Sequence, residues 1–299
     1  MRNMRRDNHD RFILTPILDI LRNTVNACAG ISNGIESQSV CEYVLQTTFL
    51  KMTGASEQKL KCICWEMATN DYEYRYKYLK KNYGECSSYT DKNKIYKDLI
   101  EMISKHDPCF GVDKLFTDVD DKHKIIDEKI EKAICNSEKK KGRVLTNIEK
   151  QKSTEGMVKY YLHEAQDDRL YKDGRVILFK RIQDKIESVI GHSLIAQWEQ
   201  HNYQNYIRSW KSLSKYKYAQ KTLLDSNLKS FFEKHVYIHR NRCAHNLLSF
   251  QNNLPTLRTL TDENFVYDNY YFRFSILILI DEVFVRLYKT YINIIESKV

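Results

Sequence analysis

Residues that break helices and shape turns are scarce in this sequence. The 299 residues include only three prolines and nine glycines. Strand-rich folds need many turns, and turns draw on both residue types. The scarcity therefore argues against a β-sandwich, barrel or propeller. We predict an all-α multi-helix bundle, with one small β-hairpin around Asp173-Gly174 in residues 170–179.

Long apolar runs are also absent. The most apolar run, Phe274 to Ile280, ends at Asp281 and Glu282, well short of the roughly 20 residues that a membrane-spanning helix needs. In the first 20 residues, Asp19 interrupts the apolar stretch from Phe12 to Ile20, so we expect no secretory signal. The sequence predicts a soluble protein without membrane attachment.

The sequence offers little that would hold a metal or a nucleotide cofactor. None of the eight cysteines forms a CxxC pair, and Cys62 and Cys64 are too close together to hold zinc in the usual way. The phosphate-binding patterns GxxxxGK[ST] and GxGxxG do not occur. We expect no metal and no cofactor. Reduced thiols are typical of the cytosol, so we predict a cytoplasmic protein.

Positive charge is in moderate excess. Lys and Arg total 48 against 39 Asp and Glu, a formal net charge of +9, which gives a mild attraction for polyanions. Residues 200–224 contain tyrosines and basic residues but no Asp or Glu, a mixture that suits phosphate contacts and base stacking in single-stranded RNA. A solvated helix face is the alternative. Candidate RNA-binding residues here are Arg208, Lys211, Lys215 and Lys217.

We divide the chain into three parts. Residues 1–135 have helical spacing and form an N-terminal helical region, in which Ser56 stands where an N-cap belongs. Residues 136–154 are almost entirely polar and basic, which is typical of a linker. Residues 155–299 form a second helical domain. It ends in two helices, from about Ser226 to Ser249 and from about Asn269 to Glu296, and the second is apolar almost all round and must be buried.

The stretch from His239 to Asn246 is the most informative part of the sequence. On an ideal helix, Phe232, Val236 and Cys243 fall on one apolar stripe that faces the core. Asn241 and His245 then lie about 180° and 220° away from Phe232. The spacing therefore predicts that these two polar residues point away from the core, and that Cys243 acts as a small hydrophobic residue.

The arrangement Arg240-Asn241-(three residues)-His245 resembles the HEPN superfamily, whose ribonucleases carry Arg, a polar residue and His at this spacing on one helix of a small bundle. The resemblance covers the motif helix and, by helical character, residues 155–299 as a HEPN-like part. It implies a metal-independent endoribonuclease that acts on RNA at a dimer interface. Family members often work in toxin–antitoxin, abortive-infection or other antiphage systems.

The chemistry of these side chains suits RNA cleavage by the 2'-hydroxyl. Imidazole exchanges a proton near neutral pH, so His245 would be the base or acid. The guanidinium of Arg240 would stabilise charge that develops on the phosphorus, and Asn241 would support either group. Arg242 and His239, in the same stretch, are further candidates for RNA contact. Two chains that pair their motif helices would form a homodimer with two such sets in one cleft.

Other functions remain open at this stage. A non-catalytic HEPN-like module would use the motif face to bind RNA or protein without cutting it, and loss of turnover in His245→Ala separates the two possibilities. A DNA-binding regulator would prefer duplex DNA, but no convincing helix-turn-helix pair is present. A toxic nuclease would also need an antitoxin or another partner protein from a defence system, which the sequence does not name.

Overall fold

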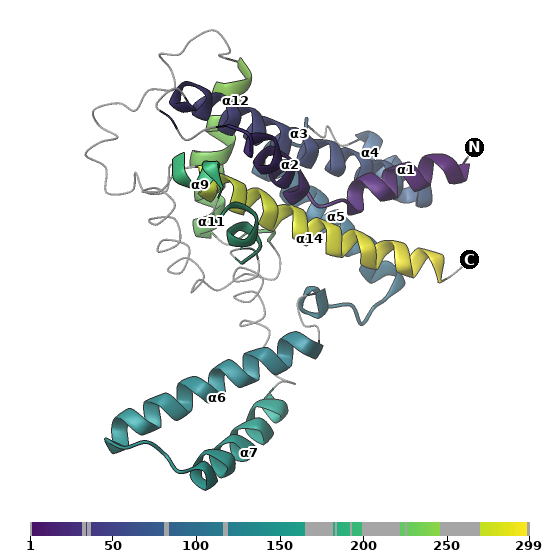
Figure 1. Ribbon diagram of the computed structural model, residues 1–299. Coiled ribbons are helices and arrows are strands. Elements are labelled where there is room, and N and C mark those ends of the chain that lie inside the picture. Colours follow the sequence, from purple (N-terminus) through teal and green to yellow (C-terminus); the bar gives the residue numbers. More distant parts are fainter. Residues whose placement is uncertain are drawn as a thin grey trace. The chain divides into compact units, whose positions relative to one another are not determined.

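The computed structural model describes residues 2–31, 34, 37–80, 84–115, 119–164, 182, 184–191, 193–198, 222–224, 226–245 and 270–297. Every regular element in these ranges is a helix (Figure 1). The predicted all-α fold is therefore confirmed for this part of the chain. Residues 170–179, where we predicted a hairpin, lie outside it.

The chain forms two compact units. The first combines Met1–Phe110 with Ile182–Val299, and the second is Gly111–Arg181. This division differs from the predicted domains 1–135 and 155–299, because helices from both ends of the chain share the first unit. The first unit contains α1 (Arg2–Leu14), α2 (Leu18–Cys28), α3 (Gln38–Asn70), α4 (Tyr72–Lys80), α5 (Tyr89–His106), α9 (Leu194–Trp198), α11 (Ser226–Phe231), η3 (Phe232–Tyr237), α12 (Ile238–His245) and α14 (Tyr270–Glu296).

The C-terminal helix α14 explains why the two ends of the chain fold together. It packs against α1, α3 and α5 (Figure 1). Every residue from Tyr270 to Asp281 is buried, as we expected for a helix that is apolar almost all round. Such a helix needs neighbours on several sides, and the N-terminal helices supply them. No helix among the described residues is long and apolar enough to cross a membrane.

Helix α3 is longer than predicted. The sequence indicated a break before Ser56, yet α3 runs without interruption from Gln38 to Asn70 and Ser56 is buried in its middle. Packing against other helices outweighs the local preference of serine for a helix start. Asp71 follows the last residue of α3, and its side chain accepts a hydrogen bond from the Tyr74 backbone N–H (2.8 Å) at the start of α4.

A buried ion pair connects α3 to α14. The Lys59 Nζ lies 2.6 Å from Asp281 Oδ1, and the two side chains are only 5% and 4% exposed. Asp281 Oδ2 also accepts a hydrogen bond from the Ile17 backbone N–H (2.9 Å), and Lys59 donates to the carbonyl of Thr15. The pair therefore joins α3 and α14 to the corner between α1 and α2.

The second unit contains η2 (Val112–Leu115) and a hairpin of two helices, α6 (Val119–Lys141) and α7 (Asn147–Glu164), which pack side by side (Figure 1). The predicted linker 136–154 instead forms the end of α6, a short turn and the start of α7. Gly142 takes a positive φ of 63° at the turn. Thr146 and Glu149 then exchange backbone-to-side-chain hydrogen bonds of 3.0 and 3.4 Å, a capping box that begins α7.

We predict that Lys59→Met lowers the free energy of unfolding by about 3 to 5 kcal/mol, because it leaves the Asp281 carboxylate buried without its counter-charge. Urea unfolding followed by far-UV circular dichroism measures the change. Arg22→Met is the control: it breaks the Arg22–Asp19 pair, whose side chains are 51% and 40% exposed, and costs less than about 1 kcal/mol. Equal losses in the two variants would contradict the role assigned to the buried pair.

Candidate functional site

The candidate motif lies at the end of one continuous helix made of α11, η3 and α12. Phe232, Val236 and Cys243 are buried on it, so this part of the predicted core stripe is confirmed. The segment η3 is a π-helical turn directly before the motif. A π turn is wider than an α turn, so it changes the direction of the residues that follow, and such turns are frequent at functional sites.

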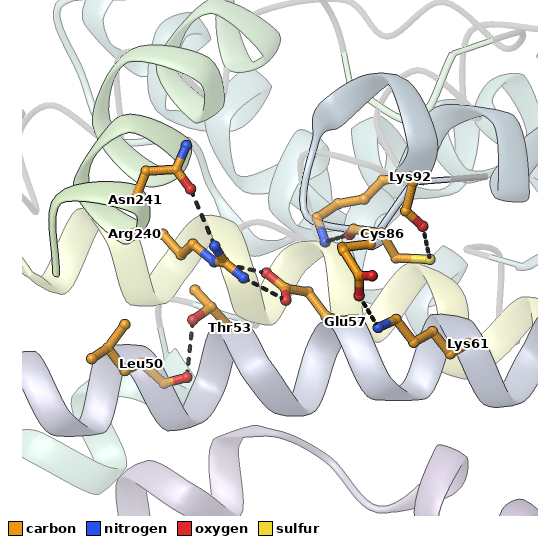
Figure 2. A network of polar contacts seen from close by, with 10 residues as sticks. Leu50, Thr53, Glu57, Lys61, Cys86, Lys92, Arg240 and Asn241 are labelled. Carbon is orange, nitrogen blue, oxygen red and sulfur yellow. Dashed lines mark hydrogen bonds and ion pairs between the residues drawn. The ribbon is translucent and has the colours of Figure 1, made fainter. Parts of the chain in front are cut away.

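Arg240 points from α12 to Glu57 on α3 (Figure 2). Arg240 Nε donates to Glu57 Oε1 at 3.2 Å, and Nη2 donates to Glu57 Oε2 at 3.0 Å. The two side chains are 24% and 13% exposed. This is the two-pronged pairing that suits a planar guanidinium and a carboxylate, and the low exposure limits its screening by solvent.

Asn241 holds the same guanidinium from another side. Its Oδ1 accepts a hydrogen bond from Arg240 Nη1 at 3.2 Å (Figure 2). A guanidinium carries five N–H donors, and its contacts within the described part of the chain use three of them. Within that part of the chain, one N–H on Nη1 and one on Nη2 have no acceptor.

A second buried cation lies near this pair. Lys92, on α5, is only 2% exposed. Its Nζ donates a hydrogen bond to the Cys86 carbonyl at 2.7 Å (Figure 2). Burial lowers the pKa of Lys92 from 10.5 to about 8; the Glu57 carboxylate opposes this shift and Arg240 adds to it. Glu57, Lys92 and Arg240 also line a cavity of about 10 Å³, close to the size of one water molecule.

His239 faces the interior of the bundle. Its Nε2 lies 3.2 Å from the Tyr270 hydroxyl and 3.4 Å from Cys243 Sγ, and its ring packs on Phe49 with centroids 5.1 Å apart. The ring therefore connects α3, α12 and α14. The predicted RNA contact of His239 would require the ring to leave these neighbours.

The structure brings Arg240 and Asn241 together, and it leaves Arg242 exposed on the same helix. His245 is the last residue of α12, but its side chain lies outside the described part. The basic residues predicted to bind RNA, Arg208, Lys211, Lys215 and Lys217, also lie outside the described residues.

Sequence reasoning missed Glu57 and Lys92. Arg240 and Glu57 are 183 positions apart, and nothing local distinguishes Glu57 from the other charged residues of its helix. A basic residue in a helix normally indicates a solvated face, so the full burial of Lys92 had no signal in the sequence. These two residues enter the site only through the packing of α3 and α5 in the same unit as α12.

Comparisons of this chain with models of protein families, with curated proteins and with solved structures found no match. The site is therefore interpreted from its own residues and geometry.

We predict that Lys92 makes stability depend on pH. Between pH 8 and about 10.5 the unfolded chain holds a proton that folded Lys92 has lost. The free energy of unfolding of the wild type therefore rises with pH in this window, by up to about 3 kcal/mol more than that of Lys92→Met. Below about pH 7 the difference in free energy between the two proteins stays constant. Urea unfolding at a series of pH values measures it.

Lys94→Met is the matched control, because Lys94 lies on the same helix with its side chain 50% exposed. Lys94→Met keeps Lys92 and should therefore show the same rise in the free energy of unfolding between pH 8 and about 10.5 as the wild type. If Lys92→Met behaves in the same way as Lys94→Met, then the ammonium of Lys92 is not held at a lowered pKa.

Proposed function

We propose that this protein is a metal-independent endoribonuclease in which Arg240, His245 and Asn241 form the catalytic set. The substrate would be tRNA or another single-stranded RNA. The proposal rests on the resemblance of the motif to HEPN ribonucleases and on the geometry around Arg240.

One observation carries the proposal furthest. The guanidinium of Arg240 is held on three N–H groups by Glu57 and Asn241. Its two further N–H groups have no acceptor among the described residues, and the side chain is 24% exposed. A cation held in this way is prepared to meet a phosphate oxygen without reorganising. Arginine is also the side chain that best matches both carboxylate and phosphate geometry.

The reaction needs two proton transfers and stabilisation of negative charge. His245 would take the proton of the RNA 2'-hydroxyl, and the 2'-oxygen would attack the adjacent phosphorus. The bond from phosphorus to the 5'-oxygen of the next nucleotide would break, and that oxygen would receive a proton from the imidazolium of His245 or from water. Arg240 would stabilise the charge on the phosphoryl oxygens. The products would be a 2',3'-cyclic phosphate and a 5'-hydroxyl.

RNA would reach this site with the help of positive charge. The chain carries a formal net charge of +9, which favours association with a polyanion. Arg242 is exposed on the motif helix and can contact a phosphate beside the cleavage site. In this proposal the basic stretch 200–224 holds the single strand further along.

Growth arrest is the biological role that accords with this activity. Cleavage of tRNA or other RNA would stop translation, which serves both antiphage defence and toxin–antitoxin systems. A neutralising partner protein would restrain the enzyme until it is needed. This part of the proposal follows from the family resemblance.

We predict that wild-type protein cleaves RNA in the presence of EDTA, and that Arg240→Ala and His245→Ala each lose at least about 100-fold in rate. Asn241→Ala should lose less, about tenfold, because it removes one hydrogen bond to a charged group. Purified proteins are incubated with total tRNA and with a generic single-stranded RNA. Gel analysis gives the rates, and end-group chemistry identifies the 2',3'-cyclic phosphate.

Arg22→Ala and His9→Ala are the controls, since these residues have the same types and lie on α2 and α1, outside the motif helix α12. Both should cleave like the wild type. If the wild type and all variants bind RNA but none of them cuts it, the result contradicts the ribonuclease proposal and supports a non-catalytic RNA-binding function.

We predict that the enzyme is a homodimer with motif helices paired, so that Arg240 of one chain works with His245 of another. Mixing Arg240→Ala with His245→Ala protein, under conditions that allow subunit exchange, should then restore about a quarter of the wild-type activity. Half of the dimers would be mixed, and each mixed dimer would hold one intact pair of Arg240 and His245 out of two. Sedimentation analysis gives the oligomeric state. A dimer whose mixture stays inactive would show that each site uses a single chain.

A further inference from the structure

We propose that Glu57 is a positioning residue, which fixes the guanidinium of Arg240 in the orientation that meets the RNA phosphate. This inference rests on the proposed ribonuclease function. It adds to the site a residue from a helix that the motif does not include, 183 positions away along the chain.

The geometry of the pair gives the first argument. Glu57 engages the Nε side of the guanidinium, through Nε and Nη2, so the plane and direction of the group are set by two bonds. Asn241 engages Nη1. The two N–H groups without an acceptor in the described part of the chain belong to the two terminal nitrogens, Nη1 and Nη2, which can donate to phosphate oxygens.

The rigidity of α3 gives the second argument. A long arginine side chain loses much rotamer freedom when it is fixed, so a mobile support would position it poorly. Glu57 instead extends from α3 two residues before Lys59, whose buried ion pair with Asp281 ties α3 to α14. The carboxylate is therefore presented from one of the best-anchored turns of the bundle.

The charge balance gives the third argument. A carboxylate paired with Arg240 would by itself cancel the positive charge that a phosphate needs. Lys92 lines the same small cavity as Glu57 and Arg240, so two basic side chains stand against one acid. At neutral pH these three side chains together carry one excess positive charge, so the pairing with Glu57 does not make the lining of the cavity negative.

The test compares Glu57→Gln with the wild type in steady-state RNA cleavage. Glutamine keeps one acceptor oxygen but not the charged fork, so kcat should fall about 10- to 100-fold while KM changes less than about threefold. Glu57→Asp keeps the carboxylate and should recover part of kcat. Circular dichroism and the unfolding midpoint establish that each variant is folded.

Glu66→Gln is the matched control. Glu66 lies on the same helix and is buried, but it pairs with His9 Nδ1 at 2.6 Å and not with the motif. This variant should lower the unfolding midpoint about as much as Glu57→Gln and leave kcat within about twofold of the wild type. If Glu57 had only a structural role, then Glu57→Gln and Glu66→Gln would have similar kcat values as well as similar unfolding midpoints.

A double-mutant cycle gives the decisive readout. In the Arg240→Ala background, Glu57→Gln should reduce cleavage no further, because the group that it positions is gone. Additive losses, or a Glu57→Gln variant with wild-type kcat, would overturn this inference and leave the ribonuclease proposal intact. Wild-type protein that cuts no RNA would overturn the ribonuclease proposal itself, and the role of Glu57 with it.

Discussion

The buried pair of Lys59 and Asp281 is the constraint on which the first unit depends. Two charges removed from water must be partnered, so α3 and α14 are held in one relative register. The same carboxylate accepts the backbone N–H of Ile17 and thereby fixes the corner between α1 and α2. Since Glu57 lies half a turn from Lys59 on α3, the register that satisfies the ion pair also determines where the partner of Arg240 lies.

Helix α3 connects the unit through polar side chains as well as apolar ones. Glu57 binds Arg240 on α12, Lys59 binds Asp281 on α14, and Glu66 contacts His9 on α1 (2.6 Å). These contacts leave α3 with partly or fully buried charges on more than one side. A helix of this kind lacks the simple amphipathic pattern of a surface helix, which explains why its length and its ends were difficult to predict.

Helical periodicity explains the buried face of the motif helix but not the inward direction of Arg240. The apolar stripe through Phe232, Val236 and Cys243 follows from helical periodicity and is buried. The π turn of η3 then alters the direction of the following residues. Arg240 reaches inward to the partly buried carboxylate of Glu57, although the chain around Arg240 is polar and would be assigned to a solvated surface by sequence alone.

By itself, the sequence determined the helical class, the buried stripe of the motif helix and the burial of α14, because periodicity and the scarcity of glycine and proline act locally. It did not predict the capping box that turns residues 136–154 into parts of two helices, nor the uninterrupted α3. Only the tertiary structure decided that Glu57 pairs with Arg240 and that Lys92 lines the same cavity. Arg240 and Glu57 are 183 positions apart and meet only because helices from both ends of the chain pack together. The free energy of that packing is spread over many contacts, which no short motif contains.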